Sequence, residues 1–228
     1  MHVLATDARS PSPAALEPAS AEWAEALIHH RQTILPKRLF EPGPDAAQLE
    51  RILATAGAAP DHGELVPWRF IIVPASERSR LADAFAASLL ERDPRAAADD
   101  VEKAREKAFR APLLMLAVVD TGAPGSEIPK AERYISAGCA IQNMLLMATA
   151  LCFASSVTGG KALRSRELRE LFALRETEDA VCFMAIGTAD RNKPIRQRPQ
   201  PSRYVSVLAP KPDRVSESAA APPSAPAS

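Results

Sequence analysis

The sequence predicts an α+β domain in which a central mixed sheet is flanked by helices. Segments with apolar residues at helical spacing are interspersed with short apolar runs of strand length. None of those runs leads into a glycine-rich phosphate-binding turn, which argues against a doubly wound dinucleotide-binding fold. With 228 residues, 46% of them hydrophobic, we expect one domain at 21–208, between disordered segments at 1–20 and 209–228.

The first predicted element is a helix capped by Ser20 and running through His30, with one apolar face formed by Trp23, Leu27 and Ile28. His29 and His30 form a pair, but no carboxylate or cysteine accompanies them at the spacing of metal ligands. We therefore expect no metal site.

The next elements follow a proline-glycine-proline break at 42–44. Asp45 and Gln48 form a capping-box signature at the start of a second helix. An aromatic and β-branched stretch at 68–73 predicts a strand. Helices are expected at 76–91 and, in a charged alanine-rich stretch, at 97–110.

The second half begins with an uninterrupted apolar run at 113–119, which predicts an interior strand. A helix of about five turns is expected from Glu132 to Phe153. A small-residue loop at 155–160, a short helix at 165–172 and another interior strand at 180–187 follow.

The helix at 134–153 is apolar on nearly all sides and has the length of a membrane span. Gln142 and Asn143 stand at its centre, and no second span is present. A membrane-associated protein remains an alternative, but we favour a central or dimer-interface helix, with no membrane contact.

Charge and cysteine content limit the function classes. Basic and acidic residues both number 28, so no overall basic field favours nucleic acid as a partner. Cys139, Cys152 and Cys182 all lie in apolar runs and form no C-x-x-C pair, which predicts buried thiols in a reducing compartment. We therefore expect a cytoplasmic protein.

Several standard catalytic motifs are missing from the sequence. Gly160-Lys161 resembles the end of a P-loop, but Ser155 and Ala162 stand at two of its required positions. No G-x-S-x-G elbow occurs, and cysteines in apolar runs are poor nucleophiles. The sequence points to no catalytic side chain.

Two features remain that suit an anionic ligand. Arg31 with Thr33 follows the first helix, and Arg196 and Arg198 lie in a basic, proline-rich extended stretch. Guanidinium groups make bidentate contacts with phosphate, and a hydroxyl adds a neutral donor. Each group taken alone is more often a solvated surface charge. The loop at 59–70, which contains His62, could hold backbone amides rigidly beside a flat ligand.

The order of the segments over about 21–208 resembles the nitroreductase family of FMN-dependent oxidoreductases, and within it the small branch with an A-P-D-H loop followed by P-W. The similarity is carried by six segments in the family's order: Arg31-Gln32-Thr33, Ala59–Phe70, Phe109–Leu113, Ser136–Ala140, Arg169–Phe172 and Phe183–Thr188.

The resemblance implies a nitroreductase-like fold and a homodimer with FMN at the subunit interface. Arg31, Gln32 and Thr33 match phosphate and ribityl contacts. Five further positions match neighbours of the flavin: Ala58, His62, Val157, Thr158 and Gly159. In the basic tail, either Arg196 or Arg198 matches an arginine that contacts the phosphate. The segment 157–159 is expected to reach the flavin from the other subunit.

The mechanism implied by the resemblance is ping-pong. NAD(P)H gives a hydride to flavin N5 and leaves, and an electron-poor acceptor, such as a nitroaromatic compound or a quinone, takes the same place. The cofactor carries the redox chemistry, so no catalytic side chain is required of the protein.

The chain departs from the family pattern at several of these positions. Gln32 replaces a second arginine, Ala58 a basic residue and Val157 a tryptophan, while Ala154-Ser155 stand where a Gly-Gly pair is usual. Losing two cations weakens phosphate binding by about 1.5–3 kcal/mol for each charge-assisted hydrogen bond that disappears. An alternative is therefore a redox-inactive dimeric protein of the same fold that binds flavin or another ligand.

Overall fold

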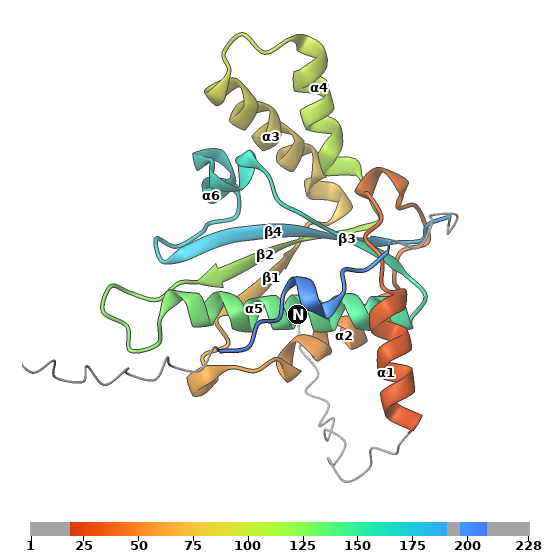
Figure 1. Ribbon diagram of the computed structural model, residues 1–228. Coiled ribbons are helices and arrows are strands. Elements are labelled where there is room, and N and C mark those ends of the chain that lie inside the picture. Colours follow the sequence, from red (N-terminus) through yellow and green to blue (C-terminus); the bar gives the residue numbers. More distant parts are fainter. Residues whose placement is uncertain (1–18, 191–196, 209–228) are drawn as a thin grey trace, which may run out of the picture. The chain divides into compact units, whose positions relative to one another are not determined.

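The computed structural model describes residues 19–190 and 197–208, which belong to two separate units, and each unit is described by itself. The first unit contains one four-stranded sheet with helices on both faces (Figure 1). The second contains a short 3₁₀ turn at Pro201–Arg203. Disorder is predicted for 1–20 and 209–228; Ala19 and Ser20 instead begin helix α1, Ala19–His30, so Ser20 lies inside the helix and does not cap it. Residues 1–18 and 209–228, and Arg196, lie outside the described residues.

The strand order is β1-β2-β4-β3, and every pair is antiparallel. The interior strands are the two predicted from apolar runs, and they are buried on both faces. The α+β class is confirmed. A mixed sheet is expected from the sequence, but the sheet is antiparallel, and in the described part of the chain the parallel pairing is an isolated bridge between Thr33 and Ser155. The strands are β1 Trp68–Ile72, β2 Leu113–Asp120, β3 Ala154–Thr158 and β4 Glu178–Gly187.

The edge strand β3 replaces the loop that the small residues at 155–160 predict. Ser155 pairs with Ile186 and Ser156 with Ala185, and both serines are buried. Serine has a low intrinsic preference for strands, but an unpaired edge of β4 next to it supplies the hydrogen-bond partners. Tertiary pairing therefore outweighs local propensity here.

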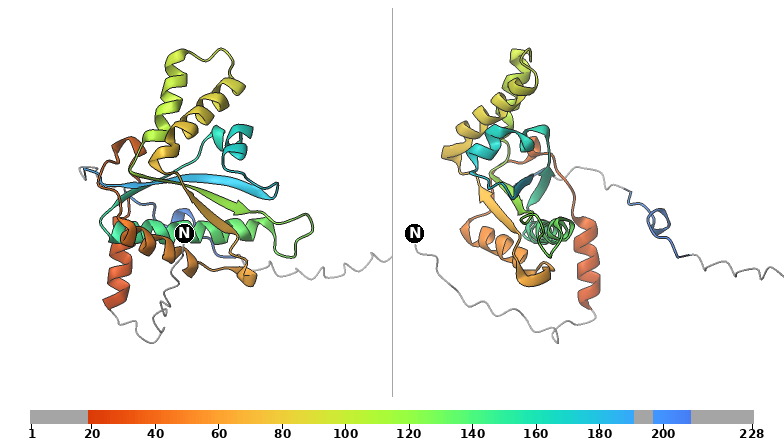
Figure 2. Two further views of the ribbon diagram at one scale, coloured as in Figure 1. Left: turned by 180° about the vertical axis from the view of Figure 1, so that it is seen from behind. Right: turned by 90° about the vertical axis from the view of Figure 1, so that its left-hand side faces the viewer.

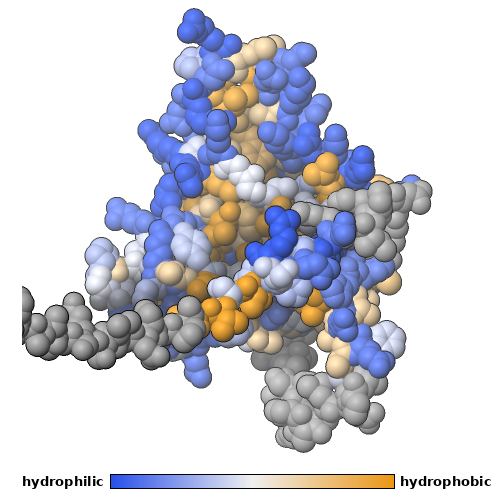
Figure 3. Space-filling model, in the orientation of Figure 1, coloured by the Kyte–Doolittle hydropathy of each residue, from blue (hydrophilic) through white to orange (hydrophobic). Residues whose placement is uncertain are grey.

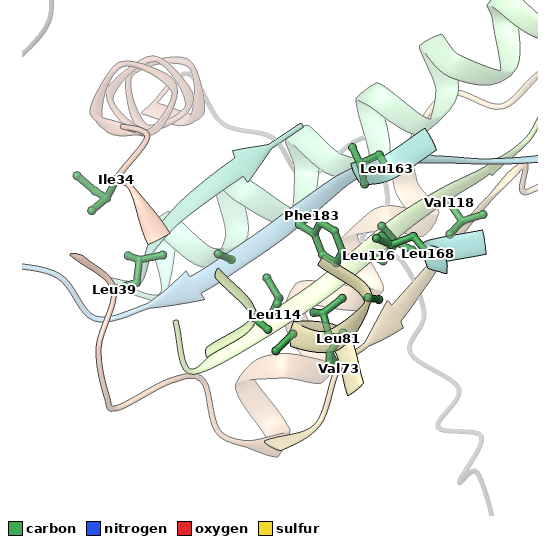
Figure 4. Packing of buried hydrophobic residues seen from close by; sticks show 14 residues of the cluster. Ile34, Leu39, Val73, Leu81, Leu114, Leu116, Val118, Leu163, Leu168 and Phe183 are labelled. Carbon is green, nitrogen blue, oxygen red and sulfur yellow. The ribbon is translucent and has the colours of Figure 1, made fainter. Parts of the chain in front are cut away.

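One face of the sheet is covered by the long helix α5, Lys130–Ala150, together with α2, Ala46–Ala54. The other face is covered by α3, Arg78–Arg92, and α6, Arg166–Leu171, and α4, Ala98–Glu106, packs against α3. Figure 2 shows the sheet between these layers, and Figure 4 shows the apolar side chains packed on the α3 side. The capping box of Asp45 and Gln48 at the start of α2 is confirmed.

The helix α5 lies against the sheet but is not buried all round. Its outer face exposes Ile135, at 65%, together with Gly138 and Gln142. No helix within the described residues has the length and apolar character needed to cross a membrane. The position of α5 against the sheet agrees with the prediction of a central helix.

The apolar face of α1, Ala19–His30, is not covered in the single chain: Trp23 is 77% exposed and Ile28 52%. The prediction of three buried thiols is wrong for two of them. Of the three cysteines, Cys182 is buried in β4, Cys139 is half-buried and Cys152 is exposed. Cys152 lies in the turn between α5 and β3, with a φ of +67°.

Candidate functional site

The segment after α1 runs beside the edge strand β3. Thr33 forms the parallel bridge to Ser155, and the Ile34 N–H donates to the Ser155 carbonyl at 3.0 Å. Arg31 Nη1 lies 3.5 Å from Thr33 Oγ1, so a guanidinium and a hydroxyl converge next to the strand. The sequence-predicted cation and hydroxyl are therefore brought to the sheet edge by backbone pairing.

The end of β3 carries the residues Val157, Thr158 and Gly159. Val157 pairs with Met184 on the α5 side of the sheet and is 40% exposed, whereas Thr158 pairs with Phe183 on the α3 side. The Thr158 hydroxyl lies 3.5 Å from the Phe183 carbonyl. A Cβ built at Gly159 would meet nothing within 4 Å, so the space beside this backbone is open.

Two serine hydroxyls of β3 are buried without a hydrogen-bond partner in the described part of the chain: those of Ser155 and Ser156. Buried hydroxyls are normally hydrogen-bonded. The two hydroxyls lie in the strand that leads directly into 157–159, the segment predicted to contact the flavin.

The loop that contains His62 has a strained backbone. Gly63 has a φ of +75°, and a Cβ there would lie 2.7 Å from the Ile128 side chain. Val66 has a φ of +46°, which is rare for a β-branched residue. The Asp61 carboxylate accepts the Val66 N–H at 2.6 Å and closes the loop. Local bonding and packing on Ile128 thus fix a conformation that residues other than glycine avoid.

His62 has a partner that the sequence did not indicate. Its Nδ1 lies 2.7 Å from Oε2 of Glu132 in the first turn of α5, and both side chains are exposed. The two residues are 70 positions apart, so only the packing of the loop against α5 brings them together.

The predicted residues therefore fall into two groups in one chain. Arg31, Gln32 and Thr33 share the β3 edge with 157–159. Ala58, which is exposed, and His62 belong to short 3₁₀ segments that pack against α5. Arg198 belongs to the second unit.

The first group lies along one sheet edge: the Arg31 guanidinium and the Thr33 hydroxyl stand beside the start of β3, and the open backbone of Gly159 follows its end. Such a site suits an anionic cofactor with a flat ring. The sequence profile described as Nitroreductase family matches residues 28–188. The chain therefore belongs to the nitroreductase family of oxidoreductases.

Individual relatives agree with this assignment. A protein of Escherichia coli K12 named "Putative NAD(P)H nitroreductase YdjA" is 35% identical over 167 residues, which cover 72% of this chain and 86% of that protein. A nitroreductase-like family protein of Bacillus cereus has a similar structure, with a TM-score of 0.71 and 18% identity over 81% of this chain and 95% of that one.

A second solved structure, of a nitroreductase with bound FMN from Desulfitobacterium hafniense, matches with a TM-score of 0.58 and 20% identity. The match covers 81% of this chain and 97% of that one. At such identities the two solved structures establish the fold alone.

Proposed function

We propose that the protein is an oxidoreductase that uses FMN as its cofactor and NAD(P)H as its electron donor, and that it acts in the cytoplasm on electron-poor acceptors such as nitroaromatic compounds or quinones. The observation that carries the proposal is the placement of Arg31 and Thr33 beside the start of the edge strand β3, whose far end is open at Gly159, in a chain of the nitroreductase family.

The residues present fit FMN in part. Arg31 and Thr33 supply a cation and a hydroxyl for the phosphate, and the open space beside Gly159 lets a flat ring approach the backbone. Gln32 and Ala58 supply no charge in place of the family's basic residues. We expect a weaker complex than in relatives, held mainly by Arg31, Thr33 and main-chain contacts at 157–159.

When bound, FMN would supply the redox chemistry, namely hydride transfer between NAD(P)H and the acceptor in a ping-pong sequence. The chain's own residues bind and orient. Arg31 and Thr33 anchor the phosphate end, and the backbone at 157–159 borders the ring. His62 is oriented by Glu132 at 2.7 Å, which fixes Nδ1 toward the carboxylate and leaves Nε2 for the ligand.

The second half of the site comes from a second copy of the chain. This part of the proposal is supported by the placement of Ala58 and His62 in segments that pack on α5 and by the exposed apolar side chains of α1 and α5, such as Trp23 at 77% and Ile135 at 65%. Exposed apolar surface of this kind is typical of protein interfaces. Light scattering during size-exclusion chromatography is expected to give the mass of a dimer, and a monomer would contradict a shared site.

Flavin binding is tested by the absorbance spectrum of the purified, desalted protein before and after addition of FMN, and then of NADH or NADPH without oxygen. We expect flavin bands that bleach on addition of the donor. Arg31→Gln is expected to weaken FMN binding roughly ten- to a hundredfold, the loss of one charge-assisted hydrogen bond. Arg51→Gln, at an exposed arginine of α2, serves as the control and is expected to bind FMN like the wild type.

The alternative, a redox-inactive binding protein, is favoured by the replacement of tryptophan by Val157, which leaves a smaller side chain, 40% exposed, at the ring position. Flavin bands that persist in the presence of NADH and NADPH would support this alternative. Absence of flavin binding at any concentration would refute both.

A further inference from the structure

A cleft of about 800 Å³ opens on the α3 side of the sheet, between α3, α4 and the chain that follows β3. Its floor is apolar and partly aromatic, since Phe85 and Phe183 meet edge to face with ring centroids 5.5 Å apart. Leu114 and Leu163 complete this floor and are labelled in Figure 4 with Phe183. Figure 3 shows apolar surface between α3 and α4, with hydrophilic side chains along both outer edges.

The rim of the cleft is strongly basic although the chain as a whole is neutral. The acidic residue in its lining, Asp100, is paired with Lys103 at 3.3 Å. Three of the lysines have no carboxylate within 4 Å among the residues that the structure describes. The six cationic residues of the rim are Lys37, Arg92, Lys103, Lys107, Arg110 and Lys161, and the three lysines without an ion pair are Lys37, Lys107 and Lys161.

These cations come from distant parts of the sequence. Lys37 lies in the 3₁₀ turn at Pro36–Arg38, Lys107 in the turn after α4, and Lys161 in the turn after β3. Unpaired cations above an apolar floor attract an anion whose body is apolar, because the ring removes apolar surface from water while the charge stays near the rim. The volume is in the range of small-molecule sites.

We infer that this cleft binds small molecules with an aromatic body and one anionic group, and that such molecules are the acceptors of the enzyme. The second part rests on the proposed function. Thr158 and Gly159 line the cleft and also belong to the segment predicted to border the flavin, so the cleft adjoins the proposed redox site.

For a nitroaromatic carboxylate the overall reaction balances with the proposed donor. NADH supplies a hydride, solvent supplies one proton, the nitro group becomes a nitroso group, and one water leaves with formation of NAD⁺. The carboxylate takes no part in the redox step and serves to hold the molecule at the rim.

The test compares two probes that differ in charge: 4-nitrobenzoate and the neutral 4-nitrobenzyl alcohol. Equilibrium dialysis against the full-length protein at low ionic strength is expected to give at least tenfold tighter binding of the anion. The preference is expected to shrink at about 0.5 M salt, where screening acts over only a few ångströms. Equal binding of the two probes would overturn the inference.

The double variant Lys37→Gln, Lys107→Gln removes two exposed cations, each worth up to about a fivefold change in affinity. We expect it to bind 4-nitrobenzoate about tenfold more weakly and the alcohol as tightly as the wild type does. Arg51→Gln, on the opposite side of the sheet, is the matched control and is expected to keep the preference. Circular dichroism verifies the fold of each variant. An unchanged preference in the double variant would refute the role of the rim.

Dialysis needs neither reductant nor turnover, so the two proposals can fail separately. If 4-nitrobenzoate is bound preferentially but NADH and NADPH never reduce bound flavin, the anion site stands and the proposed function falls. If the enzyme reduces both nitro compounds with the same kcat/KM, the proposed function stands and the assignment of anionic acceptors falls.

Discussion

Replacing Glu178 by glutamine removes the buried carboxylate at the centre of an ion-pair network at the start of β4. The carboxylate is 1% exposed and accepts two hydrogen bonds from Arg69, at 2.7 and 2.9 Å. The backbone N–H and the guanidinium of Arg175 each donate to it at 2.9 Å. The bonds from Arg69, aided by those from Arg175, outweigh the effect of burial and lower the pKa of Glu178 from 4.5 to about 2.

That pKa difference gives the magnitude of the effect. A pKa lowered from 4.5 to about 2 corresponds to roughly 3 kcal/mol of stability at neutral pH. Arg69 is 41% exposed, so solvent screens its share, and we expect Glu178→Gln to cost about 2–3 kcal/mol. For a chain of this size the melting temperature falls by about 4–12 °C.

The pH dependence has a definite sign. Because the folded-state pKa is lowered, the carboxylate stabilises the fold above pH 4.5, and this contribution is lost as the pH falls toward 2. Urea denaturation measures the free energy of unfolding at pH 7 and at pH 3.5. The difference in this free energy between wild type and Glu178→Gln is expected to fall at pH 3.5 to roughly 60% of its value at pH 7.

The control for this prediction is Glu170→Gln. Glu170 pairs with Arg166 at 2.6 Å on the surface of α6, where the two side chains are 64% and 78% exposed. Exposed pairs of this kind contribute little, and no measurable change is expected. A loss of unfolding free energy of less than 1 kcal/mol in Glu178→Gln at pH 7, or a loss that does not vary with pH, would refute the stabilising role of the carboxylate.

Three further predictions concern single side chains. Arg78 is buried and donates to three main-chain carbonyls at 2.7–3.1 Å, so Arg78→Leu is expected to cost about 3 kcal/mol by urea denaturation, and a loss below 1 kcal/mol would contradict this role. Asp45→Ala removes the capping box of α2 and is expected to cost about 1 kcal/mol in the same assay, whereas an unchanged midpoint would show that the cap is dispensable. Burial raises the pKa of Cys182 to about 11, so a thiol reagent at pH 8 is expected to label exposed Cys152 first and Cys182 only after unfolding; labelling of Cys182 in the folded protein would contradict its burial.

The sequence by itself determined the elements whose signal is local. The runs that form β2 and β4 are apolar without the polar alternation of a strand that has one face in solvent. This pattern predicts interior strands, and both lie in the interior of the sheet. The start of α2 was predictable because a capping box needs only the residues at 45 and 48. The family could also be predicted, since the order of short motifs is a property of the sequence.

Only the tertiary structure decided which residues meet. The strand β3 exists because β4 offers its edge to Ser155 and Ser156, and small polar residues carry no local signal of such pairing. The same strand brings Thr33 to the site through the bridge to Ser155. The sequence suggested an apolar face on α1 but not that this face lies open in a single chain.

Contacts between residues far apart in the sequence were also decided by the tertiary structure alone. His62 and Glu132 are 70 positions apart, and their bond at 2.7 Å depends on how the loop packs against α5. The basic cleft gathers cations from several separate segments above Phe85 and Phe183. Charge counted along the chain is neutral, because a composition records how many cations there are and only the fold places them side by side.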